Sequence, residues 1–189
     1  MLIINMRSEA EMKIVIVRHF KVHYKAKGMN NSSDFEEYIT NYDNSQVIEN
    51  KIDLDCNIIW DKSYCSDLKR AIITAKSIYD KELEITDLLR EVQMYPVKKS
   101  QLKIPSFLWS ISSRIAWKLN HVSQLETETH TRKRAKEFLS NLDLNSDENI
   151  LIVSHGFFLV TLVNELKSLG FKGSIPRKIK NGHLYVLQK

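Results

Sequence analysis

Two runs of four consecutive apolar residues, each followed within two positions by a histidine, constrain this chain more than any other feature. The first run, Ile14–Val17, precedes His19, and the second, Ile150–Val153, precedes His155. A strand that is apolar on both faces is typical of a parallel sheet that is covered on both sides. The carboxyl ends of parallel strands lie along one edge of the sheet, where ligands bind. The sequence therefore predicts that His19 and His155 meet across one crevice, although most of the chain separates them.

Strand and helix patterns alternate along the rest of the chain. Further strands are predicted at 62–65, 83–86 and 183–187, and helices at 34–42, 68–79, 106–120, 128–142 and 158–166, with Ser66 or Asp67 as the cap of the second helix. This alternation predicts one domain over residues 1–189, a three-layer α/β/α fold with a mostly parallel central sheet. Residues 1–11 precede the first apolar run and are a candidate extension of the core.

The composition excludes several classes of protein. Apolar residues make up 43% of the 189 residues, which excludes a disordered chain. No apolar run reaches the ~18 residues of a membrane span, so we expect no membrane partner. The two cysteines, Cys56 and Cys65, lack metal or redox spacing, which favours a reduced cytoplasmic protein with Cys65 as a small core residue.

The positive charge is uneven. The net charge is +5, and residues 98–136 alone carry nine basic and two acidic side chains. Nucleic-acid binding is one reading of this segment, which also holds Phe107, Trp109 and Trp117. Aromatic residues at helical spacing are more often core than stacking platforms, so we expect no nucleic-acid partner. If these charges face the crevice instead, they steer anionic substrates toward it.

Arginines join the histidines at the predicted sheet edge. Arg18 follows the first strand, and Arg70 lies in the first turn of a predicted helix, whose N-terminus itself attracts anions. The planar guanidinium group donates two parallel hydrogen bonds to a phosphate. Two arginines with His19 and His155 therefore predict a site for a phosphate-like dianion.

Six segments together resemble the histidine phosphatase superfamily (branch 1), the phosphoglycerate mutase-like proteins. They occur in family order: Ile14–His19 (IVIVRH), Cys65–Ile78 (CSDLKRAIITAKSI), Leu89–Glu91 (LRE), Leu125–Phe138 as a loose match, Leu151–Phe157 (LIVSHGF) and Asn181-Gly182. The resemblance implies a phosphoglycerate mutase-like fold and phosphoryl chemistry. We expect no metal ion and no cofactor, because the sequence has no cluster of carboxylates, Cys or His at metal-ligand spacing.

The resemblance also assigns roles to individual residues. It implies that His19 is the nucleophile that becomes phosphorylated. It implies that Glu91 donates a proton to the leaving group and then acts as the base for water. The phosphoryl oxygens would be held by Arg18, Arg70, His155 and the backbone N–H of Gly156.

The sequence departs from the family pattern just after the nucleophile. The usual Gly-Glu-Thr is Phe20-Lys21-Val22 here, and Lys25 stands where an Asn is expected. Part of the phosphate pocket must therefore be built differently. Lys21, His23 and Lys25 are all candidate replacement donors, and the sequence does not choose among them.

Glu91 faces a chemical constraint. A general acid must hold a proton when it acts, whereas an unperturbed glutamic acid with a pKa of ~4.3 is protonated in only about one molecule in 500 at pH 7. We therefore expect Glu91 to be buried or to gain its proton beside the substrate's negative charge. The competing interpretation is a surface carboxylate that pairs with Arg90 or Lys98.

The favoured function is hydrolysis of a phosphomonoester through a phosphohistidine. The stretch between Glu91 and His155 is short and the chain ends soon after its last predicted strand, whereas the resemblance implies insertions and a tail for a mutase. The alternatives are phosphoglycerate mutase-type transfer and a catalytically weak phosphate-binding module. The expected partner is a small phosphorylated metabolite, such as a sugar phosphate, a nucleotide or a phosphoamino acid, bound by a monomer or homodimer.

Overall fold

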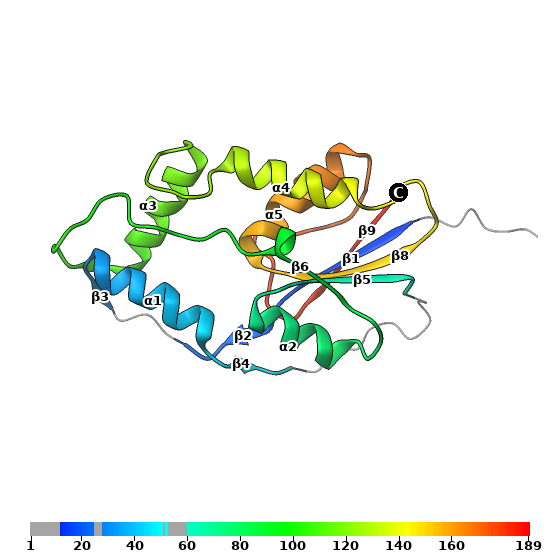
Figure 1. The fold of residues 1–189 in the computed structure, drawn as a ribbon, viewed down its shortest axis with the longest axis horizontal. Helices are drawn as coiled ribbons and strands as arrows, with labels where there is room; N and C mark the ends of the chain where they lie inside the picture. The colour runs from blue at the N-terminus through cyan, green and yellow to red at the C-terminus, as the bar shows by residue number, and fades with distance from the viewer. Residues whose placement is uncertain (1–11, 25–27, 51, 53–59) are drawn as a thin grey trace, which may run out of the picture.

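A five-stranded sheet forms the centre of the computed structural model, which describes residues 12–24, 28–50, 52 and 60–189 (Figure 1). Its strand order is β6-β5-β8-β1-β9. The strands are β1 (Lys13–Arg18), β5 (Lys62–Ser66), β6 (Glu84–Thr86), β8 (Asn149–Ser154) and β9 (Leu184–Gln188). The first four run parallel and β9 pairs antiparallel with β1. The predicted mostly parallel sheet is confirmed.

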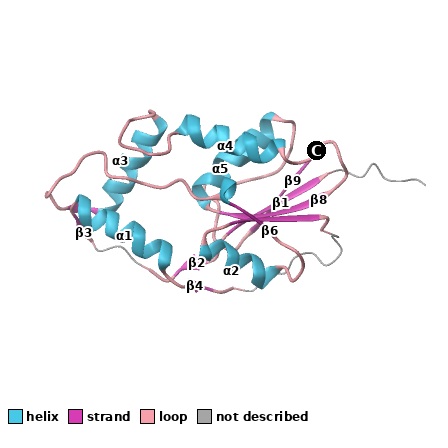
Figure 2. Cartoon of the chain, viewed as in Figure 1, coloured by secondary structure: helices cyan, strands magenta, loops and turns pink. Residues whose placement is uncertain are grey.

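Helices cover both faces of this sheet, which confirms the three-layer prediction. Helix α2 (Lys69–Ile78) packs on one face. Helices α4 (Glu128–Ser140) and α5 (Gly156–Ser168) pack on the other face, as Figure 2 shows.

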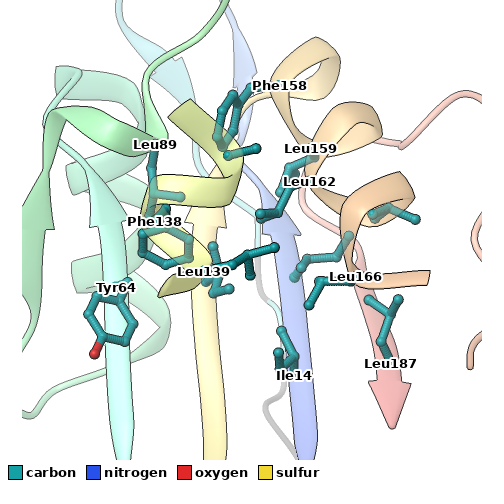
Figure 3. Close-up of a cluster of buried hydrophobic side chains, with 14 of the residues drawn as sticks. Ile14, Tyr64, Leu89, Phe138, Leu139, Phe158, Leu159, Leu162, Leu166 and Leu187 are labelled. Carbon is teal, nitrogen blue, oxygen red and sulfur yellow. The ribbon is translucent and has the colours of Figure 1, made fainter. Parts of the chain in front are cut away.

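The double-sided burial of β1 and β8 explains their continuous apolar runs. Ile14 and Ile16 belong to the core cluster under α4 and α5, part of which is drawn in Figure 3. Val15 and Val17 point to the other face and pack with the α2 side. All four are at most 1% exposed, so neither face of β1 has room for a polar side chain.

Two further helices lie beyond the carboxyl ends of the parallel strands, at the left of Figure 1. They are α1 (Ser32–Asn44) and α3 (Ser106–Lys118). Two small antiparallel ladders join their flanking segments: β2 (Lys21–Val22) with β4 (Val47–Ile48), and β3 (Met29–Asn30) with β7 (Ile104–Pro105). The indole Nε1 of Trp109 donates to the carbonyl of Asn30 at 2.8 Å and ties α3 to β3. A short helix, η1 (Asp87–Leu89), follows β6.

Helix α3 is apolar on two faces, and the structure buries only one of them. Trp109 and Trp117 are buried, as predicted. The expectation that Phe107 belongs to the core is wrong, because its side chain is 61% exposed. The stripe whose spacing predicted this helix is also exposed: Leu108, Ile111, Ile115 and Leu119. Periodicity locates a helix but does not choose between two apolar faces.

The predicted cap of α2 is also wrong. The helix begins after Leu68, and no side chain caps it. The Ser66 hydroxyl bonds His155 Nε2 at 2.8 Å and accepts from the N–H of Leu68, the residue before the helix, at 3.2 Å. The Asp67 carboxylate pairs with Arg90. Cys65 is a fully buried core residue, as expected.

Some expectations cannot be compared with the fold. Cys56, Lys25 and residues 1–11 lie outside the described residues. Within the described ranges, no helix has the length and hydropathy needed to cross a bilayer.

Candidate active site

His19 lies directly after β1, with 2% of its surface exposed. Its Nδ1 lies 2.6 Å from the carbonyl oxygen of Phe20 and donates to it in the neutral ring. Burial, the charge of Arg70 and then that of Arg18 lower the pKa of His19 to about 3. The imidazole is therefore neutral at ordinary pH, with the lone pair on Nε2.

Neighbouring residues fix the loop after His19 and explain why Phe20 is accommodated where the family pattern has a glycine. Asn181 Nδ2 donates to the His19 carbonyl at 2.8 Å, and the Phe20 N–H donates to Thr74 Oγ1 at 2.8 Å. Phe20 is 1% exposed, and a Cβ at Gly182 would lie 3.0 Å from its ring. The bulky residue therefore packs against a glycine whose φ is +64°.

His155 meets His19 as the sheet topology predicts. It precedes α5 as its N-cap, is fully buried, and its ring centroid lies 5.0 Å from that of His19. Burial, with the charge of Arg70 next, holds the pKa of His155 well below its usual value. Both histidines are therefore neutral.

Arg18 lies against the start of α5. Its Nη1 donates to the carbonyl of Ile179 at 2.9 Å. A Cβ at Gly156 would lie 2.8 Å from Arg18 Cζ, closer than van der Waals contact allows. Only a glycine at this position lets the guanidinium group lie where it does.

Arg70 occupies the first turn of α2, as predicted, and is 2% exposed. Its Nη1 donates to Asp43 Oδ1 at 2.7 Å, and its Cζ lies 5.5 Å from the Tyr42 ring centroid. Burial raises the pKa of Asp43, although Arg70 opposes the shift. Nothing in the polar α1 segment marks Asp43 or Tyr42 as site residues, so neither is predicted from the sequence.

Three of the residues predicted to hold phosphate have polar atoms without a protein partner. Within the described residues, four buried side-chain atoms are so placed: Arg18 Nε, Arg70 Nε, His155 Nδ1 and Asn30 Oδ1. Buried polar groups are nearly always hydrogen-bonded. The arginine Nε atoms are donors, and His155 Nδ1 is a donor when its Nε2 accepts from the Ser66 hydroxyl, so all three suit the acceptor oxygens of a phosphoryl group.

Glu91 lies at the N-terminus of α5. Its Oε1 accepts from the N–H groups of Val92 and Phe158 at 2.9 and 3.0 Å, and Oε2 accepts from Phe157 at 3.2 Å. The half-buried carboxylate thus caps the helix, where a negative charge is favourable. The competing interpretation fails for Arg90, which pairs with Asp67 instead.

Most of these side chains line a cavity of about 390 Å³, here called the sheet-edge cavity, although His155 is not among its lining residues. Its walls include Arg18, His19, Arg70 and Glu91, with Tyr38, Tyr42, Asp43 and Arg114 opposite the predicted set. Lys21 and His23, two of the candidate replacement donors, do not line it.

Arg114 on α3 is a cavity cation that the sequence did not predict. Its Cζ lies 3.7 Å from the Phe157 ring centroid, and its Nη1 donates to the Val92 carbonyl at 3.0 Å. Burial lowers the pKa of Arg114. No sequence pattern distinguishes Arg114 from the other basic residues of the 98–136 segment.

Most other charges of that segment do not face the cavity. Arg132 and Lys136 pair with Glu165 on the outer surface. Arg134 pairs with Glu126 and also donates to the Leu88 and Arg90 carbonyls, which braces the segment before Glu91. The basic segment therefore contributes one cation to the cavity and is otherwise largely paired or exposed.

Over the described part of the chain, no group of three or more His, Cys, Asp or Glu side chains is arranged to hold a metal ion.

Comparisons with known proteins agree with this geometry. The model of branch 1 of the histidine phosphatase superfamily matches residues 14–188. A comparison with curated protein sequences gave no significant match.

Solved structures share the fold at low identity. A phosphoglycerate mutase from Bacillus anthracis has a TM-score of 0.60 at 16% identity, covering 95% of this chain and 88% of its own. A mycobacterial glucosyl-3-phosphoglycerate phosphatase has a TM-score of 0.57 at 15% identity, covering 94% and 90%. An alpha-ribazole phosphatase from Shigella flexneri has a TM-score of 0.57 at 18% identity, covering 93% and 89%.

Proposed function

Because the chain belongs to branch 1 of the histidine phosphatase superfamily, we propose that it hydrolyses a small phosphorylated metabolite without a metal ion, through a phosphohistidine at His19. The observation that carries this proposal is that Arg18, Arg70 and His155 each keep a buried polar atom without a protein partner, around the neutral His19. A phosphoryl group supplies acceptor oxygens for all three donors, and its phosphorus lies within reach of a nitrogen lone pair.

The first step is attack by His19 Nε2 on phosphorus. The Nδ1–H bond to the Phe20 carbonyl fixes the tautomer, so the nucleophilic lone pair stays on Nε2. As the N–P bond forms, the P–O bond to the leaving alcohol breaks. The two arginines stabilise the charge on the equatorial oxygens.

Glu91 completes both steps. Its Oε1 already accepts two N–H groups and Oε2 accepts one, so Oε2 keeps the position that can carry a proton. This proton passes to the leaving oxygen, and the substrate's dianionic charge is what favours proton uptake beforehand. Water then attacks phosphorus, gives its proton to Glu91, and the N–P bond breaks to release inorganic phosphate.

A panel of phosphorylated metabolites tests this function, with release of inorganic phosphate as the readout. The panel should include sugar phosphates, nucleotides, phosphoamino acids and phosphoglycerate. We expect turnover of at least one ester by the wild type and a loss of at least about a thousandfold in His19→Ala. Retained turnover in that variant would refute the assignment.

The same panel separates the alternatives. Transfer of the phosphoryl group within phosphoglycerate, without release of phosphate, would identify a mutase. Binding of vanadate without turnover of any ester would identify a phosphate-binding module.

A further inference from the structure

A second hollow, larger and more apolar than the sheet-edge cavity, lies between α3, α5 and the segment before β9. Its volume is about 780 Å³, within the range of small-molecule sites. We call it the α3 groove, and its apolar walls are Ile111, Ile115, Leu119, Phe157, Val160 and Ile179.

The α3 groove adjoins the sheet-edge cavity. Arg18, Glu91, Met94 and Arg114 line both. A molecule that spans the two hollows therefore passes Glu91, and the groove begins where the proposed proton donor stands.

This placement decides which part of a substrate enters the groove. In an in-line displacement, the leaving oxygen lies opposite the attacking nitrogen. If His19 attacks and Glu91 protonates the leaving oxygen, as proposed above, the organic group on that oxygen points away from His19, past Glu91. The inference rests on that proposed function, and the groove becomes the site of the leaving group.

The groove walls select the chemistry of that group. Ile111, Ile115 and Leu119 are 50%, 54% and 73% exposed, so α3 presents a row of uncovered aliphatic side chains. Monomeric proteins seldom expose a contiguous apolar row without a binding role. On the opposite side, the Phe157 ring packs edge-on against Trp117, with 4.7 Å between the ring centroids.

Charges at the groove complement a substrate that is apolar at one end and dianionic at the other. Arg177 and Lys178 line the groove next to Ile179, whose carbonyl holds Arg18. Neither forms an ion pair with the part of the chain that the structure describes. They attract an anionic ester to the groove. The aliphatic wall has no hydrogen-bonding groups for the hydroxyl groups of a sugar.

We propose that the α3 groove binds the leaving group of the substrate, and that this group is an apolar alcohol rather than a polyol or a hydroxy acid. Each methylene that the groove covers should strengthen transition-state binding about two- to fourfold. A phosphomonoester with a chain of several carbon atoms is then preferred over a short one that leaves the groove empty.

A homologous series of n-alkyl phosphates, from ethyl to octyl, tests the proposal below the concentration at which octyl phosphate forms micelles. For the wild type we expect kcat/KM to rise at least tenfold from ethyl to octyl phosphate. In the double variant Ile111→Ser/Ile115→Ser this octyl-to-ethyl ratio should fall at least fivefold. Leu108→Ser is the matched control, since Leu108 lies on the same helix, is 40% exposed and does not line the groove. Its ratio should match the wild type.

The outcomes separate this inference from the function on which it rests. The inference is overturned if every ester is hydrolysed with the same kcat/KM, or if the octyl-to-ethyl ratio falls as much in Leu108→Ser as in the double variant. Either result leaves the proposed phosphatase activity intact. Failure to hydrolyse any phosphomonoester overturns the phosphatase. In that case the dissociation constants of octylphosphonate and ethylphosphonate test whether the groove binds an apolar chain, and equal dissociation constants would show that it does not.

Discussion

The sheet-edge cavity and the α3 groove adjoin each other but are built in opposite ways. Charged and polar side chains dominate the chemistry of the cavity, where His19 and Arg70 are each 2% exposed, and the fully buried His155 packs against His19. The groove consists largely of exposed aliphatic side chains on α3. Strand ends and a helix start hold the cavity residues, whereas the groove depends on where α3 sits. The difference indicates a division of work: the sheet edge positions the phosphoryl group, and α3 selects what is attached to it.

The residue where the two regions meet should give the largest effect. Glu91→Gln keeps the size of the side chain but cannot donate the proton, so we expect kcat/KM for an alkyl phosphate to fall by roughly 10²–10³. An aryl phosphate with an acidic leaving alcohol needs little protonation and should lose much less. Steady-state kinetics on both esters checks this. Equal losses on both would mean that Glu91 acts only by capping α5.

The buried His19 of the cavity should make stability depend on pH. His19 has a folded pKa of about 3, below its unfolded value of about 6.5, so the unfolded state binds more protons as the pH falls between them. Stability is therefore present above pH 6.5 and lost toward pH 3. From pH 6.5 to 4.5 this site alone should cost roughly 2 kcal/mol.

Urea denaturation of the wild type and His19→Gln at pH 6.5 and 4.5 measures the contribution of His19 to the free energy of unfolding. The wild type should lose roughly 2 kcal/mol more than the variant, because the carboxylates titrate in both. The same loss in both proteins would show that His19 is not held neutral.

The contact between Arg18 and Gly156 gives a smaller effect. In Gly156→Ala the new Cβ displaces the guanidinium group, and a misplaced phosphate ligand should lower kcat/KM about tenfold for every ester, short or long. The control is Gly28→Ala, since a Cβ at Gly28 meets nothing within 4 Å. Gly156 also lines the α3 groove, so a loss confined to long-chain esters would instead mean that the new Cβ acts on the leaving group and not on Arg18.

The Asp43–Arg70 pair gives the smallest effect. Phosphate must compete with Asp43 for the guanidinium group, so Asp43→Asn should bind inorganic phosphate about threefold more tightly. The variant should also lose about 1–3 kcal/mol of stability, because Arg70 is left buried without its counter-ion. Calorimetric titration and thermal unfolding measure the two changes. Weaker phosphate binding would show that Asp43 mainly orients Arg70.

The sequence predicted the cavity far better than the groove, and the reason is physical. An apolar run buried on both faces identifies a parallel strand, and parallel strands bring their ends together without further information. His19, His155 and Arg70 follow from that rule. The order of the strands and the antiparallel β9 complete the sheet without moving these residues.

Residues that reach the cavity only through long-range packing could not be predicted in this way. Arg114 reaches the cavity because Trp109 bonds the Asn30 carbonyl and Trp117 bonds Thr131 Oγ1 at 2.9 Å, which together set the rotation of α3. Asp43 arrives from the far end of α1. Local sequence patterns carry no information on such long-range contacts. For the same reason, the sequence did not predict which apolar face of α3 is exposed.

Rapid-quench trapping of the phosphoenzyme tests the central claim most directly. A phosphoryl-labelled ester that turns over should leave a label that is stable in alkali and lost in acid. Peptide mapping should place this label on His19, and His19→Ala should carry none. Label on any other residue, or turnover by the wild type with no trapped phosphohistidine, would contradict the account.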